Sequence, residues 1–159
     1  MKHDIWKLVI AIAVCQMAGV VGSLFTLPNI PTWYDALAKP DLAPPGSLIG
    51  LVWVTLFTLM GISLYMVWAN GLKKEKVRGA VTAFGIQLVL NAAWSFLFFG
   101  LRSPFYGLIG IAVMWMAIAY TMAMFWKVSR TATYLLVPYI AWVTFAGYLN
   151  FLIWQLNPH

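Results

Sequence analysis

Charged residues are scarce in this chain, and their scarcity decides its class. Only 9% of the 159 residues are charged, whereas 63% are hydrophobic and the mean hydropathy is +0.85. Soluble domains carry about 25% charged residues. This small number of polar side chains cannot cover a water-facing surface. We therefore exclude a soluble domain and predict an integral membrane protein.

Cysteine and histidine are rarer still, which removes several kinds of chemistry. Cys15 is the single cysteine, so no intramolecular disulfide forms, and His3 and His159 stand at opposite ends of the chain. No hydrophobic run offers histidine or cysteine at metal-ligand spacing, and no Ser-His-Asp or Cys-His arrangement is available. We therefore predict no metal site and no cofactor, and no acid–base or nucleophilic catalysis.

Five hydrophobic runs are long enough to cross a bilayer, which takes about 20 residues each. Every charged residue lies outside them. We expect spans at residues 8–27, 48–69, 79–101, 105–126 and 132–156 of a single domain covering 1–159, with a loop at 28–47. Short connections favour antiparallel neighbours, so the predicted fold is all-α: a compact bundle of five transmembrane helices.

The basic residues, which give a net charge of +6, divide unequally between the two ends of this bundle. Lys39 and Arg102 belong to one end. The other end holds Lys2, Lys7, Lys73, Lys74, Lys76, Arg78, Lys127 and Arg130. The excess of positive charge at one end predicts a cytoplasmic N-terminus. Basic residues at the ends of spans suit lipid headgroups, so membrane lipid is a predicted partner and nucleic acid is not.

No Asp, Glu, Lys, Arg or His stands in the middle of an expected span. This disfavours a proton pump or an ion-coupled carrier, because these generally need an ionisable group at membrane depth. Aromatic and amide side chains remain. Gln87, Asn91 and Trp94 fall on one helix face, where the amides either hydrogen-bond to a backbone carbonyl of a neighbouring helix or border a ligand site.

The second and fifth spans carry comparable stripes of aromatic and small residues. These are Trp53, Phe57 and Gly61 in the second span, and Trp142, Ala146, Leu149 and Asn150 in the fifth. Each aromatic side chain alone is more often core than ligand wall. Tryptophans on three helices beside amides together predict a cavity for a flat, largely apolar molecule. Pro138, one turn before Trp142, predicts a kink.

The expected loop at 28–47 is long for a small bundle, and long loops often act as lids. Trp33 and Tyr34 either fold over the mouth of the bundle or anchor at the membrane interface. Lys39 and Asn29 are candidate partners for an acidic group of a ligand.

Short motifs follow one another in order along almost the whole chain. They comprise Trp33, Tyr34, Leu37, Lys39, Pro40, Pro44, Pro45, Trp53, Leu59, Met60, Gly61, Gln87, Leu88, Leu90, Asn91, Trp94, Phe98, Phe99, Gly100, Pro138, Tyr139, Ala141, Trp142, Phe145, Ala146, Leu149 and Asn150. As an ordered set they resemble the TspO/MBR family, the translocator proteins once called peripheral benzodiazepine receptors.

The resemblance implies a five-helix membrane protein, often a homodimer, that binds porphyrins and benzodiazepine-type or isoquinoline carboxamide ligands. Bacterial relatives are linked to tetrapyrrole handling and to light-dependent breakdown of protoporphyrin, and mitochondrial relatives to cholesterol. Trp53 and Trp142 match the tryptophans tied to porphyrin photochemistry. The implied ligand-binding residues are Pro45, Gly46, Trp53, Asn91, Trp94, Trp142, Ala146 and Leu149, with Trp33, Tyr34 and Lys39 in a lid.

Two departures from the family pattern bear on the ligand. Leu42 stands where the family commonly has an aromatic residue before the two prolines. Phe151 and Gln155 replace the Tyr and the Lys or Arg of the cholesterol motif, which removes support for sterol binding. The mitochondrial outer membrane and a bacterial plasma membrane are both open, and the missing motif together with the unequal distribution of basic residues favours the prokaryotic one. The leading hypothesis is a tetrapyrrole-binding membrane receptor. A photochemical enzyme, and a transporter of lipophilic molecules or a membrane scaffold, are the alternatives.

Overall fold

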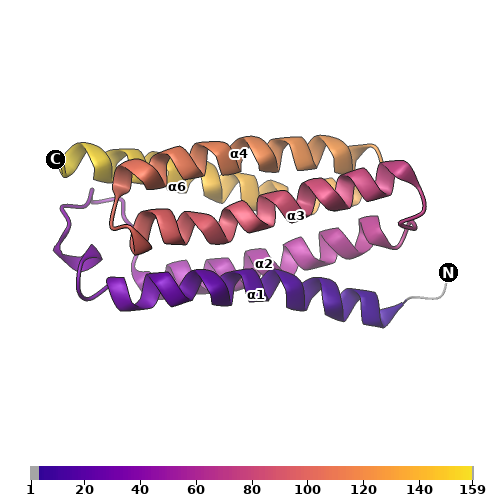
Figure 1. The fold of residues 1–159 in the computed structure, drawn as a ribbon, viewed down its shortest axis with the longest axis horizontal. Coiled ribbons are helices and arrows are strands. Elements are labelled where there is room, and N and C mark those ends of the chain that lie inside the picture. Colours follow the sequence, from indigo (N-terminus) through magenta and orange to yellow (C-terminus); the bar gives the residue numbers. More distant parts are fainter. Residues whose placement is uncertain (1–3, 159) are drawn as a thin grey trace.

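A computed structural model of the chain describes residues 4–158, and over that range it consists of helices, turns and one loop (Figure 1). Five helical segments in it are long and apolar enough to cross a membrane. They are α1 (Ile5–Asn29), α2 (Gly46–Trp68), α3 (Glu75–Ser95) continued by η2 (Phe96–Gly100), α4 (Pro104–Trp126), and α5 (Arg130–Leu135) followed by α6 (Val137–Leu156). The predicted all-α bundle of five membrane helices is confirmed.

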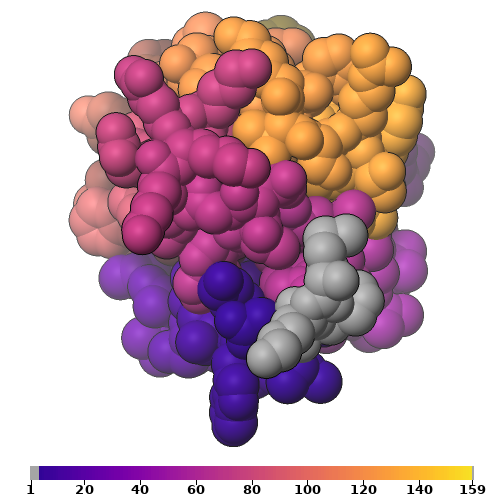
Figure 2. Space-filling model, turned by 90° about the vertical axis from the view of Figure 1, so that its right-hand side faces the viewer, coloured from indigo at the N-terminus to yellow at the C-terminus, as the bar shows by residue number. Residues whose placement is uncertain are grey.

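The two ends of the bundle differ in character. Figure 1 shows the 30–45 loop, the turn between η2 and α4 and the C-terminus at one end, which we call the loop end. The N-terminus, the α2–α3 connection and the α4–α5 turn lie at the other, and Figure 2 shows this face. Lys73, Lys74 and Lys127 belong to these connections and Arg130 opens α5, so we call it the basic end. Lys2, counted with them in the sequence, lies outside the described residues.

The first helix is longer at both ends than the predicted span 8–27. It begins at Ile5, where an ion pair of 3.5 Å joins Lys7 to Asp4, and it runs through Pro28 to Asn29. Pro28 removes only its own backbone donor, while the Ile30 N–H still bonds to the Thr26 carbonyl at 3.1 Å. The expected loop 28–47 is therefore shorter and spans residues 30–45.

The predicted spans 48–69, 79–101, 105–126 and 132–156 also begin too late. Hydropathy marks only the apolar part of a helix, whereas the first turn accepts polar residues and proline. Glu75 thus opens α3, and Pro104 opens α4 behind Ser103, whose hydroxyl accepts a hydrogen bond from the Tyr106 N–H at 3.1 Å.

The kink expected at Pro138 is confirmed as a break in the fifth span. α5 ends at Leu135 and α6 begins at Val137, so Leu136 forms the junction. Proline cannot donate to the carbonyl one turn earlier, which interrupts the helical ladder.

Side chains fill the core of the basic half. Val67, Phe84 and Phe125 are buried there, and the two phenyl rings stack with centroids 5.8 Å apart. Near the middle, α1 crosses α2 so closely that a Cβ placed on Gly61 would lie 2.5 Å from the Ile12 Cα. The loop half is different, because the helices there enclose open space.

Candidate ligand cavity

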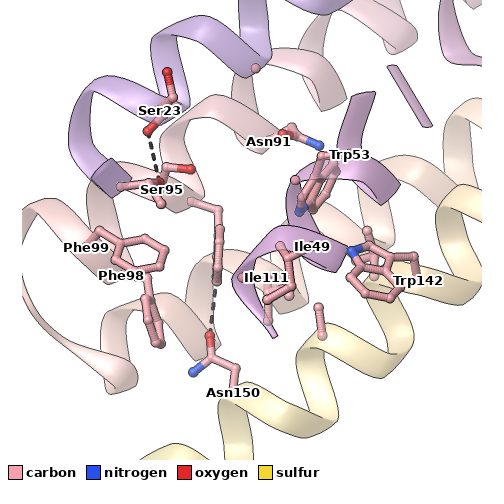
Figure 3. Close-up of a pocket in the computed structure, with 18 of the residues that line it drawn as sticks. Ser23, Ile49, Trp53, Asn91, Ser95, Phe98, Phe99, Ile111, Trp142 and Asn150 are labelled. Atoms are coloured by element: carbon pink, nitrogen blue, oxygen red, sulfur yellow. Dashed lines mark hydrogen bonds between the residues drawn. The ribbon is translucent and has the colours of Figure 1, made fainter. Parts of the chain in front are cut away.

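A cavity of about 560 Å³ lies in the loop half of the bundle, and α1, α2, α3, α4 and α6 all contribute to its wall. Pockets of about 300–1,000 Å³ accommodate drug-sized ligands. Most of the wall is aliphatic or aromatic (Figure 3). The Phe57 ring closes the wall against Gly19 of α1, where an added Cβ would approach it to 2.8 Å.

The structure brings nearly all the predicted ligand-binding residues to this cavity. Lining it are Gly46, Trp53, Asn91, Trp94, Trp142, Ala146 and Leu149. Pro45 does not line it, because this residue adopts an extended conformation before α2 and is exposed, and Pro44 borders the cavity instead.

Trp53 and Trp142 supply two indole rings to the wall, from α2 and α6. The Trp53 ring stacks on Phe57 with centroids 5.4 Å apart, and Trp142 packs beside Phe145 at 5.5 Å. Neither indole N–H donates a hydrogen bond to any of the described residues, and neither is enclosed by protein. Both are therefore available as donors in an apolar environment, where a hydrogen bond to a ligand is strongest.

Trp94 lines the cavity differently, because its N–H is already used. It donates to Asn150 Oδ1 at 3.2 Å, and Asn150 Nδ2 donates to the Pro104 carbonyl at 2.8 Å. The Trp94 ring stacks on Phe98 with centroids 5.1 Å apart. This chain of contacts joins α3, α4 and α6, so Trp94 presents a fixed aromatic surface to the cavity.

The amides of Gln87 and Asn91 meet one hydroxyl on α6. Asn91 Nδ2 donates to Tyr139 Oη at 2.8 Å, and Tyr139 Oη donates to Gln87 Oε1, also at 2.8 Å. Of the three residues only Asn91 lines the cavity. Asn91 does bond to a neighbouring helix, but its partner is the Tyr139 hydroxyl and not the backbone carbonyl expected, and Asn91 also borders the cavity.

The loop packs over the mouth of the bundle, with a short helical turn at Tyr34–Ala36. The Trp33 ring lies edge-on to Phe98 and Phe99, with centroids 5.4 and 6.3 Å away, and Tyr34 contacts the same rings. Tyr34 lines the cavity and Trp33 does not. Burial raises the pKa of the Tyr34 hydroxyl, and the neighbouring Asp35 carboxylate raises it further, so the phenol stays protonated.

Lys39 lies outside the cavity wall, where its ammonium group stabilises the loop itself. Nζ donates to the backbone carbonyls of Tyr34, Leu37 and Asp35 at 2.8, 3.1 and 3.4 Å. It also lies 4.7 Å from the centroid of the Tyr34 ring. Asn29, the other residue expected near an acidic group, instead accepts a hydrogen bond from Arg102 Nε at 2.9 Å.

Comparison with known proteins identifies the family of this chain. A sequence profile of the TspO/MBR family matches residues 11–155. The chain belongs to the TspO/MBR family. It is 46% identical over 158 residues to the Tryptophan-rich protein TspO of Chlorobaculum tepidum, an alignment that covers 99% of this chain and 100% of the relative.

Other TspO/MBR relatives come from a mammal and from a second bacterium. The Translocator protein of Bos taurus is 38% identical over 89% of this chain and 85% of its own. Protein CrtK of Rhodobacter capsulatus is 36% identical over 91% of this chain and 88% of its own. Family membership and the five apolar helices together make this chain an integral, multi-pass membrane protein.

Sequence reasoning missed several polar residues of this cavity. Gln16 borders it from α1, with Nε2 donating to the Val54 carbonyl and to Thr58 Oγ1 at 3.1 and 3.0 Å. Ser95 lies four residues after Asn91, so continuing the α3 stripe by one turn would have found it. Asp35 was missed because the loop conformation decides which of its side chains face inward.

Metal-ligating groups are sparse in the part of the chain described. No group of three His, Cys, Asp or Glu residues there could hold a metal ion. His3 and His159 lie outside the described residues.

Proposed function

We propose that this TspO/MBR protein is a membrane receptor for tetrapyrroles of the protoporphyrin type and for similarly flat, hydrophobic drug-like molecules. The observation that carries the proposal is the 560 Å³ cavity walled by Trp53, Trp94 and Trp142 from three different helices. A porphyrin ring would pack against these indoles, with Asn91 as a polar orienter. Aromatic surfaces of this kind bind flat ligands through offset or edge-on contacts.

The carboxylates of such a ligand would lie near the start of α2. Gly46 borders the cavity, and the backbone N–H groups of Gly46 and Ser47 make no backbone hydrogen bond with a described residue. Free N–H groups and the helix dipole at a helix start favour an anion. Lys39 is committed to the loop and Asp35 has the same charge as the ligand, so neither attracts these carboxylates.

Titration of the Trp53→Phe, Trp142→Phe double variant with protoporphyrin tests the receptor proposal. We expect weaker binding and less quenching of tryptophan fluorescence than in the wild type. A matched control replaces Trp6 and Trp126 with phenylalanine, since both are exposed and neither lines the cavity. Equal affinity and quenching in both double variants would remove Trp53 and Trp142 from the site.

Light-dependent degradation of the bound porphyrin is a second candidate function, favoured by the two indoles that border one cavity. Excited porphyrin would exchange an electron with Trp53 or Trp142, or form reactive oxygen that the cavity confines; the reactivity would belong to the pigment. Product spectra under light, in darkness and with free tryptophan test this. If free tryptophan gives the same product at the same rate, the protein is not a catalyst.

Transport of a lipophilic molecule is the alternative to a receptor function. The filled core around Phe84 and Phe125 at the basic end weighs against a continuous passage. Porphyrin flux across proteoliposomes would support transport, whereas tight binding without flux would support the receptor.

We also propose a homodimer in a prokaryotic plasma membrane, with the N-terminus cytoplasmic and the basic end against anionic lipid. Terminal reporter fusions test the orientation, and light scattering of the detergent-solubilised protein tests the dimer. An N-terminal reporter active outside the cytoplasm would overturn this topology.

A further inference from the structure

Behind the cavity wall, three side chains form a short hydrogen-bonded relay. Gln87 on α3 and Tyr139 on α6 are each 1% exposed, and neither lines the cavity. Tyr139 Oη lies 2.8 Å from Gln87 Oε1 and 2.8 Å from Asn91 Nδ2. Of the three, only Asn91 lines the cavity, and Figure 3 shows its side chain there.

The single phenolic proton gives this relay a direction. Tyr139 donates its proton to Gln87 Oε1, so the phenol oxygen accepts from the Asn91 amide nitrogen. Asn91 Oδ1 then remains without a donor among residues 4–158. Gln87 Nε2 is the one side-chain N or O atom in that range that is both enclosed and unpartnered. Asn91 Oδ1 is therefore not enclosed, and the space that it borders is the cavity.

The opposite direction requires the Gln87 amide, which is 1% exposed, to rotate within the packed core. If the Gln87 amide rotated, Nε2 would donate to Tyr139 and Oε1 would become the unpartnered atom. The phenolic proton would turn to Asn91 Oδ1, and Asn91 Nδ2 would face the cavity. The orientation of the Gln87 amide therefore sets the direction of the relay.

The geometry points to Gln87 as a positioning residue that sets, through Tyr139, which end of the Asn91 amide meets the ligand. In the direction observed, Asn91 offers an acceptor, while Trp53 and Trp142 offer donors from the same wall. At the position of Asn91 the cavity therefore selects flat aromatic ligands that carry an N–H group at their edge, of the pyrrole or lactam class. This inference rests on the proposed receptor function and adds the chemical class that the receptor prefers.

Two tricyclic probes of nearly the same shape test the inference. Carbazole has an N–H group where dibenzofuran has an oxygen atom, so the ratio of their dissociation constants reports the hydrogen bond at that position. Because one such bond contributes about 0.5–1.5 kcal/mol, we expect the wild-type protein to bind carbazole about twofold to thirteenfold more tightly. In Gln87→Met, Tyr139 keeps only Asn91 as a partner, so the preference should fall to none or reverse.

Three further variants separate the relay from general effects on folding. Tyr139→Phe removes both hydrogen bonds, and Asn91→Leu removes the contact group, so each should abolish the preference. Ser63→Ala is the matched control: Ser63 is fully buried and donates to the Ala132 carbonyl at 2.7 Å, away from the cavity, so the ratio should stay at its wild-type value.

The outcomes separate this inference from the proposed function. Wild-type protein that binds neither probe, or that does not prefer carbazole, overturns the inference. So does a preference unchanged in Gln87→Met or Asn91→Leu, because it would arise elsewhere. If protoporphyrin fails to displace carbazole while the preference follows the relay, the tetrapyrrole proposal fails and the role of Gln87 stands.

Discussion

Replacing Gly61 with alanine tests how α1 is held against the rest of the bundle. The added Cβ would lie 2.5 Å from the Ile12 Cα and 2.9 Å from its backbone nitrogen. Carbon atoms in contact are normally about 3.5–4.0 Å apart, so α1 must move by roughly 1–1.5 Å. Backbone atoms cannot rotate aside as a side-chain tip can. We therefore expect Gly61→Ala to destabilise the protein by about 1–3 kcal/mol, the usual cost of overpacking a core.

Thermal unfolding in detergent measures this change directly. Cys15 on α1 is fully buried, so a thiol-reactive fluorogenic dye reports when α1 leaves the bundle. Gly85→Ala is the matched control, because nothing beyond its chain neighbours and its own helix backbone lies within 4 Å of the position that its Cβ would take. Alanine is the better helix former, so the control should be unchanged or more stable by up to about 1 kcal/mol.

The same variant should also affect the cavity, because Gly19 and Gly22 of α1 form part of its wall. A shifted α1 changes the spacing between this wall and Trp53, so affinity for protoporphyrin should fall together with stability. A Gly61→Ala protein that unfolds at the same temperature as the Gly85→Ala control would refute the close crossing of α1 and α2.

Three other substitutions test the wall and the loop. Asn150→Leu leaves the Trp94 indole and the Pro104 carbonyl without their hydrogen bonds, so it should lower the free energy of unfolding by about 1–3 kcal/mol. The measurement is the unfolding temperature, and an unchanged temperature would argue against these two hydrogen bonds. Lys39→Met should speed hydrogen exchange over residues 34–39, because it removes the hydrogen bonds from Nζ to the loop carbonyls. It should change the affinity for protoporphyrin and for its dimethyl ester by the same factor, because Lys39 does not contact the carboxylates. A selective loss for the free acid would mean that Lys39 binds the carboxylates. Trp33→Ala should make the loop more susceptible to limited proteolysis, and wild-type cleavage rates would show that Trp33 does not hold the loop down.

The sequence predicted the number of spans well, because charged residues flank membrane helices and an uncharged apolar run of about 20 residues is rarely anything other than a membrane span. It also predicted which faces of the second, third and fifth spans meet, since helical periodicity aligns Trp53, Asn91 and Trp142 with small or polar neighbours. The break near Pro138 followed from the missing backbone donor.

Other features depend on contacts that helical periodicity does not encode. Gln16 joined the wall because α1 crosses α2 near Gly61, and the angle of that crossing is set by packing. Which groups Lys39 contacts depends on how the loop folds back on itself. Its charge alone suggested that it binds an acidic group of a ligand, whereas in the structure it donates to a backbone carbonyl of the loop. Lipid-facing and cavity-facing residues are equally apolar in a membrane protein, so hydropathy cannot tell them apart.

Because the loop half of the bundle contains the cavity and the basic half is filled by side chains, a bound molecule has access to only one side of the bilayer. The hollow half reaches from the loop to about the depth of Phe57 and Met114, while side chains such as Phe84 and Phe125 occupy the interior beyond. A guest in the hollow thus exchanges with one leaflet, or with the water beside it, and reaches the far side only if packed helices separate. Which leaflet supplies the guest is then decided when the chain is inserted, by the charges that orient it.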